Sequence, residues 1–397
     1  MNTDGRYSQP EWFIELPDRL LKWCVQVMDP EHFGLFRNTV DSDLPWEMQT
    51  AWHMLLTLDR LGMVDRVPGY SEEACAATVA YMQSLQDPET GVFENPHIDS
   101  RHPDRDNEDT FRVYRIHNAG RAAGILRILG GRPQYPVPAL PKDERGVDGA
   151  FVMKYVRDLP WNNPWAACSH TCRLIVSLFR EVEDGNESVI PLLREALEFV
   201  IAKQNPKTGL WGKLPETPEF QQISGTLKIL PSLISCLGLT PPYMDRIADS
   251  CIRLHREGRV YDECTSACIP RNIDEVAGFC LETGDDRADE IRETLADIAA
   301  FHYRNWQTPD GGFCDERSGR SRILGACAVE IAGPSDERRG DVGGFNCMVH
   351  GTGVVAGALG WDTSMIPSPT AGWRDRVARL RHRVILHDRG RIEIATR

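Results

Sequence analysis

The chain has 397 residues, of which 41% are apolar and 26% charged, as is typical of a globular protein with one large domain or a few average ones. Its net charge of -13 argues against nucleic acid or an anionic membrane as a partner, although residues 374–397 are locally basic. No apolar run reaches the roughly 20 residues that span a bilayer, and the first residues lack a signal peptide's apolar core. The twelve cysteines include no Cys-x-x-Cys pair. We therefore expect reduced thiols and a cytoplasmic location.

Nearly every segment places its apolar residues at the spacing of an amphipathic helix. The predicted helices span residues 12–28, 46–61, 71–86, 109–130, 148–156, 164–182, 189–204, 220–237, 242–255, 263–281, 287–306 and 346–359. In the tail, two short apolar runs at residues 384–386 and 392–394 flank a turn and predict a small β-hairpin. The chain is therefore predicted to be all-α, with a basic C-terminal tail of residues 365–397 carrying a helix and this hairpin.

One short pattern occurs three times, at residues 86–93, 204–211 and 307–313. In each copy a helix ends in Gln, a turn with Pro follows, and then come Gly and an aromatic residue. Gly permits a left-handed turn, and the Gln amide is able to bond backbone groups left open at helix ends. Recurrence of this kind is the signature of a repeat architecture.

These turns resemble the Gln-Trp repeats of terpenoid cyclases and of protein prenyltransferase β subunits. The resemblance implies an (α/α)6 toroid over residues 1–364, with inner helices that begin near six positions. These positions are Trp46, Asp109, Pro164, Gln221, Cys264 and Asn346. It also implies an enzyme with its active site at one mouth of the toroid, acting by acid or metal-assisted chemistry on an isoprenoid or related small molecule.

Residues 106–110, Asp-Asn-Glu-Asp-Thr, resemble the Asp-x-Asp-Asp-Thr motif of class II terpene cyclases, in which the middle acid protonates the substrate. The resemblance implies that Glu108 and Asp109 are catalytic, with Glu standing where the family has Asp. Crowded carboxylates raise one another's pKa and so keep a proton available. Alternatively, Asp109 only caps the helix and favours its dipole. Arg112 and Arg115, together with Arg121, lie on the same helix and are expected to neutralise an anionic substrate.

A second resemblance concerns Asp262, Cys264 and His350. Protein prenyltransferase β subunits bind zinc through an Asp-x-Cys at one inner helix and a His on the next. The resemblance implies a zinc site here, with Cys268 and Cys347 as further candidate ligands. Asp, Cys and His with one open position suit catalytic zinc. The alternative is a buried His beside small core cysteines, since unliganded Cys is commonly buried.

Polar and aromatic residues recur near the predicted inner-helix starts, which keeps a carbohydrate-active lyase or glycoside hydrolase open as an alternative. His117 and His170 are candidate bases for such chemistry, since His is the commonest side chain to transfer a proton. The residues expected to bind a small molecule or an oligosaccharide, besides Arg112 and Arg115, are Asn118, Trp161, Asn163, Trp165, Gln222, Asn272 and Asn346. A toroid that only binds its ligand remains a third alternative. The sequence leaves the oligomeric state open.

Overall fold

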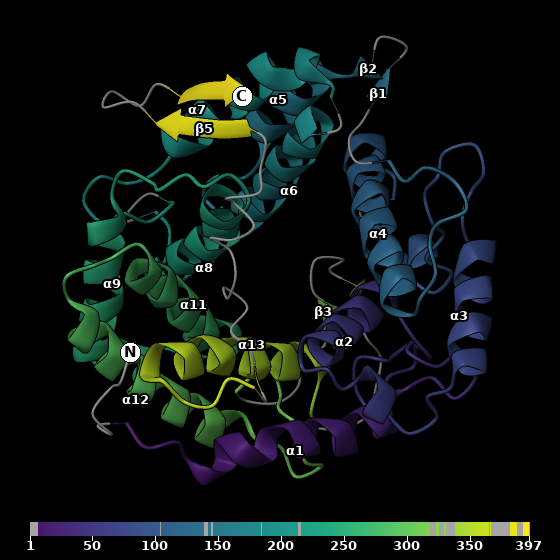
Figure 1. Cartoon of the computed structure of the whole chain (residues 1–397), viewed down its shortest axis with the longest axis horizontal. Coiled ribbons are helices and arrows are strands. Elements are labelled where there is room, and N and C mark those ends of the chain that lie inside the picture. The colour runs from purple at the N-terminus through teal and green to yellow at the C-terminus, as the bar shows by residue number, and fades with distance from the viewer. Residues whose placement is uncertain are drawn as a thin grey trace. The chain divides into compact units, whose positions relative to one another are not determined.

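The computed structural model describes residues 7–103, 105–138, 142–143, 146–183, 185–212, 216–317, 323–324, 329–330, 338–364, 366, 382–386 and 392–396 (Figure 1). These residues confirm the all-α prediction, and paired helices are consistent with the expected toroid class. The α-helices are α1 (Glu11–Val27), α2 (Met48–Arg60), α3 (Glu72–Ser84), α4 (Glu108–Ile128), α5 (Gly149–Asp158), α6 (Pro164–Glu183), α7 (Ile190–Ile201), α8 (Glu219–Leu230), α9 (Met244–Arg256), α10 (Arg259–Asp262), α11 (Cys268–Glu282), α12 (Ala288–Trp306) and α13 (Val342–Leu359).

Short elements complete the list. Single helical turns are η1 (Val64–Arg66), η2 (Asp99–Arg101) and η3 (Glu187–Val189), and the π-helical turn η4 (Pro231–Cys236) follows α8. The strands are β1 (Lys142–Asp143), β2 (Gly146–Val147), β3 (Ile323–Leu324), β4 (Val329–Glu330), β5 (His382–Leu386) and β6 (Ile392–Thr396). Neighbouring strands pair as antiparallel hairpins. The β5–β6 pair, with Val384 opposite Ile394, confirms the predicted tail hairpin, whereas the helix predicted before it lies outside the described residues.

Contacts divide the chain into two compact units. Unit 1 comprises Met1–Ala139, Thr265–Cys268 and Ala300–Pro367, and unit 2 comprises Leu140–Cys264, Ile269–Ala299 and Ser368–Arg397. Each unit contains segments that are distant in sequence: α13 returns to pack on α2 in unit 1, and β6 packs on α7 in unit 2. The predicted division after residue 364 stays a prediction.

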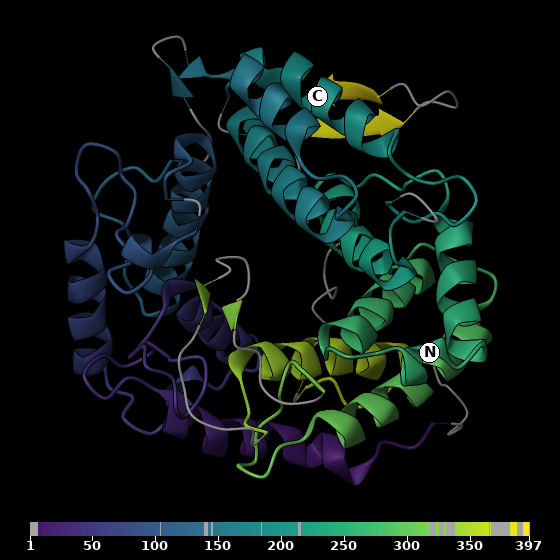
Figure 2. The ribbon, with the colours of Figure 1, turned by 180° about the vertical axis from the view of Figure 1, so that it is seen from behind.

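In unit 1, α2 packs against both α4 and α13, and α2 and α4 lie side by side in both views (Figures 1 and 2). The ring of Trp23 in α1 lies 4.5 Å from that of Phe345 in α13. Helix α13 is long and apolar enough to cross a membrane by length and composition alone, but 83% of it is buried inside the protein. This burial is what a core helix requires, since an all-round apolar helix needs cover on every side.

In unit 2, α6 is the central helix and packs against α5, α7 and α8. The close contact with α8 depends on Gly225, where a Cβ atom would lie 2.7 Å from Cβ and 2.8 Å from the carbonyl oxygen of Pro164. Pro231 ends α8, because proline lacks the N–H group that continues the helical bonding. The chain then changes to the wider π-helical turn η4.

The three repeat turns have the geometry that their sequence predicts. Gly91, Gly209 and Gly311 have φ angles of 70°, 71° and 88°, a left-handed conformation that only glycine adopts at little cost. The aromatic residue of each turn is buried, and the terminal Gln pairs with it across a β-bridge. In the first two copies the Gln side-chain amide also donates to the glycine carbonyl oxygen. The turn is therefore a reproducible local unit.

Two predicted helix starts were wrong, and the first is that of α13, which begins at Val342 and not at residue 346. The helix expected from residue 263 begins at Cys268 instead, preceded by the short helix α10 and a non-helical stretch. Ser266 in this stretch pairs with Glu316 in a β-bridge, and the Arg317 amide donates to the Thr265 carbonyl oxygen at 2.7 Å. Pairing with a distant segment holds this backbone extended and delays the start of the helix. Asp262 and Cys264 consequently precede α11 and do not begin it.

Candidate functional site

The partly exposed face of α6 in unit 2 is lined by polar and small side chains. Ala166, His170, Arg173 and Ser177 are all partly exposed, and their spacing of four, three and four residues places them along one face of the helix. Residues on the other side, such as Leu174, are buried. Polar side chains at three of these four positions suit a ligand that carries polar groups, and Val176 and Trp165 add partly exposed apolar surface beside them.

His170 on this face is paired with a tyrosine from the preceding helix. The Tyr155 hydroxyl oxygen lies 2.9 Å from His170 Nδ1, and the Tyr155 ring stacks near Phe151 of the same helix. Either group is able to donate in this hydrogen bond, according to the tautomer of the imidazole. Both side chains are partly exposed, so the pair combines a fixed orientation with access from solvent. The predicted base therefore has a hydroxyl partner, which the sequence did not reveal.

Helix α8 adds a cation beside the start of this face. The Lys228 Nζ atom lies 5.8 Å from the centre of the Trp165 ring, a cation–π arrangement. Trp165 is partly exposed, as a platform for a sugar ring needs to be. The predicted binding residue Trp165 thus lies on the same helix as His170, with Lys228 of α8 beside its ring.

Four other predicted binding residues of unit 2 also hold the local structure together. The Trp161 indole donates to the Val156 carbonyl oxygen at 3.0 Å, and Asn163 accepts from the Ala166 amide at the start of α6. The remaining two are buried amides: Gln222 donates to the Thr217 carbonyl oxygen, and Asn272 donates to the Ser224 hydroxyl. These bonds explain the positions of the amides, and their role in ligand binding stays a prediction.

The predicted residues of α4 belong to unit 1, whereas α6 belongs to unit 2. Glu108 begins the helix and is exposed, and the Asp109 side chain lies outside the described residues. Arg112 is exposed, whereas Arg115 and His117 are partly exposed. Asn118 is buried and accepts a 2.6 Å hydrogen bond from Arg121. These side chains point to several sides of one helix, and their catalytic and binding roles stay predictions.

The residues predicted to bind zinc fall in different units. Asp262 is exposed and Cys264 buried in unit 2, while His350 lies in α13 of unit 1. Arg60 Nη1 is 3.0 Å from each ring nitrogen of His350, so a guanidinium cation already lies close to both nitrogens. The zinc prediction for these three residues remains a prediction. Asn346, one turn before His350, is buried.

A different set of ligand-type side chains meets in unit 1. Cys268, Asp315 and Cys347 each offer one atom, and these atoms lie within 4.8 Å of one another. Two of these residues were candidate ligands from the sequence, but Asp315 was missed. Asp315 follows Phe313 of the third repeat turn by two residues, and this position beside a predicted turn could have identified it as a candidate ligand.

Two buried carboxyl groups of unit 2 have opposite environments. Burial, reinforced by the charge of Glu275, raises the pKa of Asp274 well above its ordinary value, and neither carboxyl oxygen has a hydrogen-bond partner. The raised pKa favours the neutral carboxyl, and the contribution of Asp274 to stability is lost as the pH rises through that raised value. Glu219 instead bonds both Arg253 and Arg259. It serves as a buried anion that holds α8 to α9 and α10.

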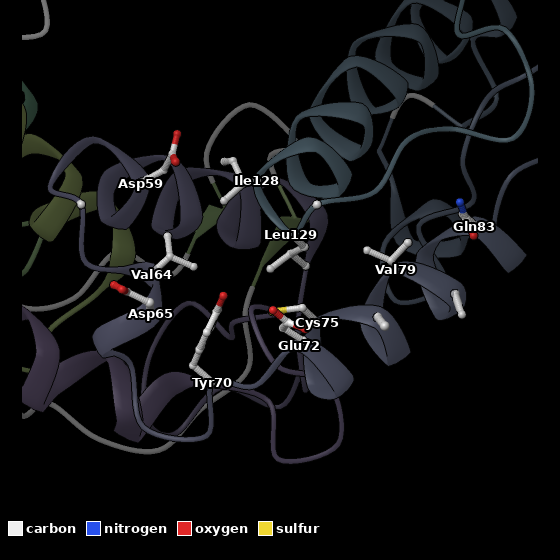
Figure 3. A pocket seen from close by; sticks show the side chains of 14 residues that line it. Asp59, Val64, Asp65, Tyr70, Glu72, Cys75, Val79, Gln83, Ile128 and Leu129 are labelled. Atoms are coloured by element: carbon white, nitrogen blue, oxygen red, sulfur yellow. The ribbon is translucent and has the colours of Figure 1, made fainter.

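A surface pocket of about 710 Å³ lies in unit 1, between the length of α3 and the C-terminal ends of α2 and α4. In Figure 3 the carboxylates of Asp59, Asp65 and Glu72 stand around it, and Leu129 contributes to an apolar wall. Burial and the charge of Glu72 raise the pKa of Cys75 in its lining. None of the predicted site residues lines this pocket, so it is separate from the candidate sites above.

No family model matches the sequence, and no curated protein matches it. Among solved structures, the chain is similar to the GH76A alpha-1,6-mannanase from Salegentibacter sp. HEL1_6. The two share 12% sequence identity with a TM-score of 0.46, over 88% of this chain and 99% of that chain.

Proposed function

We propose that the protein is a carbohydrate-active enzyme that acts at the polar face of α6 in unit 2, with His170 and Tyr155 as its acid–base pair. The observation that carries this proposal is the 2.9 Å contact between the Tyr155 hydroxyl and His170 Nδ1, made by two partly exposed side chains. A general base and a general acid held in contact, with solvent access, are what proton transfer to and from a bound sugar requires.

The reaction that suits this pair best is β-elimination from a uronate-containing polysaccharide. One member of the pair removes the proton on the carbon next to the carboxylate, and the C–H electrons form a carbon–carbon double bond. The C–O bond to the leaving sugar breaks, and the other member supplies the proton to that oxygen. Arg173 follows His170 by one helical turn, where a guanidinium is able to neutralise the substrate carboxylate.

Hydrolysis is less well supported by the described part of unit 2, because glycosidases need two carboxyl groups on opposite sides of the scissile bond. Asp274 has the raised pKa that a general acid needs, but its side chain is fully buried. Glu219 forms ion pairs with Arg253 and Arg259, and Glu275 forms one with Arg271 at 2.5 Å. Chemistry on an isoprenoid requires an apolar wall, and His170 and Arg173 interrupt the apolar surface of the α6 face with polar side chains. Elimination thus has the best support.

The test is to incubate the purified protein separately with uronate polysaccharides and with neutral mannans. Elimination gives products that absorb in the ultraviolet through the new conjugated double bond, whereas hydrolysis gives reducing ends alone. We expect the absorbing product from a uronate polymer, and a loss of roughly 10²- to 10⁴-fold in rate for His170→Ala. Tyr155→Phe should also lower the rate, because it removes only the hydroxyl.

A second Tyr–His pair in the same unit supplies a matched control. The Tyr261 hydroxyl lies 2.8 Å from His255 Nδ1, and His255 Nε2 lies 3.5 Å from Asp297. His255→Ala therefore removes a similar contact at a site whose imidazole is already engaged by a carboxylate, and it should leave turnover unchanged. Reducing ends without the absorbing product, or equal losses in the two His variants, would contradict the elimination proposal.

A further inference from the structure

We propose that Cys268, Asp315 and Cys347 of unit 1 form a zinc site with one coordination position left open. The Cys268 Sγ atom lies 3.3 Å from Cys347 Sγ and 3.4 Å from Asp315 Oδ1. Two thiolates and a carboxylate are ligands that select zinc over harder cations such as magnesium and calcium. The proposal concerns unit 1 and does not depend on the function proposed for unit 2.

Backbone hydrogen bonds fix the two loop segments that carry Cys268 and Asp315. The Ala267 amide donates to the Asp315 carbonyl oxygen at 2.7 Å, next to the bridge between Ser266 and Glu316. These bonds align the start of α11 with the turn after Phe313. The first two ligands are therefore held together without any metal, as a preorganised site requires.

Asp341 attaches the third segment to the same turn. One of its carboxylate oxygens accepts from the Asp315 amide and the other from the Gly344 amide, both at 2.7 Å. Gly344 allows this close approach, since a Cβ atom there would lie 2.3 Å from the Phe313 carbonyl oxygen. Asp341 thus joins the Asp315 turn to the first turn of α13, the helix that carries Cys347.

The spacing of the ligand atoms is close to that of a tetrahedral centre. A zinc–sulfur bond of about 2.3 Å places two ligand sulfurs about 3.8 Å apart, so a small outward movement of the thiols admits the cation. The Ser266 hydroxyl donates to Asp315 Oδ1 at 3.0 Å, which orients the carboxylate as outer hydrogen bonds do in metal sites. Cys268 and Asp315 are partly exposed, so water or a substrate atom has access to the fourth position.

A disulfide between Cys268 and Cys347 is the competing explanation for two neighbouring sulfurs. A disulfide requires a sulfur–sulfur distance of about 2.05 Å, and it gives the carboxylate of Asp315 no role. A zinc ion uses all three side chains and relieves the repulsion that thiolates and a carboxylate exert on one another at this distance. The placement of Asp315 therefore favours the metal.

Metal analysis of the full-length protein tests the site. We expect close to one zinc per chain in the wild type, and its loss in Cys268→Ser and Cys347→Ser. Asp315→Asn should weaken binding by roughly 10- to 100-fold, because an amide is a poorer ligand than a carboxylate. Cys75→Ser, which changes another buried thiol of unit 1, is the control and should keep the metal.

A second measurement avoids dependence on the folding of the variants. Wild-type protein stripped with a chelator is titrated with cobalt, and binding should produce thiolate-to-cobalt charge transfer and the strong visible bands of a tetrahedral centre. Absence of zinc and of these bands in the wild type would overturn the proposal. So would full zinc content in both serine variants, or a Cys268–Cys347 disulfide found by non-reducing peptide mapping of the freshly purified wild type.

Discussion

The Gln86 turn of unit 1 and the Gln204 turn of unit 2 have the same backbone but different side-chain bonding. In both turns, the backbone amide of the residue after Gln donates to the carbonyl oxygen of the residue before the aromatic one. The two nitrogen–oxygen distances are 2.9 Å in the Gln86 turn and 2.8 Å in the Gln204 turn. Gln86 Nε2 donates to the carbonyl oxygens of Gly91 and Tyr135, and its Oε1 accepts from two further amides. Among the described residues, the Gln204 side chain bonds only to its own turn, and its buried Oε1 has no partner there.

The repeated sequence therefore determines the backbone conformation of the turn but not which neighbouring segments bond to it. Gln86 gains its extra bonds because residues 134–135, which follow α4, pass beside it. In unit 2 the aromatic residue takes over part of this attachment. The Trp211 indole donates to the Val200 carbonyl oxygen at 2.7 Å, and its amide donates to the Thr226 hydroxyl. One turn is thus held chiefly by its Gln, the other chiefly by its Trp.

The largest effect is expected from truncating the aromatic residues. Trp211→Ala should lower the free energy of unfolding by roughly 3–5 kcal/mol, since it empties a large buried volume and leaves the Val200 carbonyl oxygen without its donor. Phe93→Ala should cost less, because Phe93 is smaller and its ring donates no hydrogen bond. Urea unfolding measures both. An equal or larger loss for Phe93→Ala would show that unit 2 does not depend on its Trp more than unit 1 depends on its Phe.

The glycines of the turns should give the next effect. Gly91→Ala places a Cβ atom 1.9 Å from the Pro136 carbonyl oxygen in a left-handed backbone, and we expect a loss of roughly 2–4 kcal/mol. Gly311 has a similar φ angle, but a Cβ atom there has no neighbour within 4 Å. Gly311→Ala should therefore cost only the conformational strain of about 1–2 kcal/mol. Thermal unfolding of the two variants checks this, and matching losses would rule out a contribution from residues 134–138.

The Gln side chains should give the smallest effect and the sharpest contrast. Gln86→Ala removes four hydrogen bonds and should cost roughly 2–3 kcal/mol, whereas Gln204→Ala removes one and should cost about 1 kcal/mol. Equilibrium unfolding in urea compares the two variants directly. If Gln204→Ala proved the more damaging, the proposed division of roles between Gln and Trp would be wrong.

Much of the fold was predictable because it depends on local spacing. The helix periodicity, the three repeat turns and the tail hairpin follow from side chains whose partners are a few residues away. A left-handed glycine or a turn of a helix has the same physical cause wherever it occurs. The start of α11 was not predictable in this way, since the extended backbone at Ser266 depends on pairing with Glu316, fifty residues further along the chain.

The candidate sites show the same limit more strongly. The sequence by itself identified His170, Cys268 and Cys347 as residues of the right chemical type, because type is a property of the single side chain. Only the tertiary structure decided their partners, placing Tyr155 against His170 and Asp315 against the two thiols. A hydrogen bond or a metal centre requires atoms within about 3–4 Å. Such distances between remote residues are set by helix packing and by backbone pairing between segments, neither of which is encoded in local spacing.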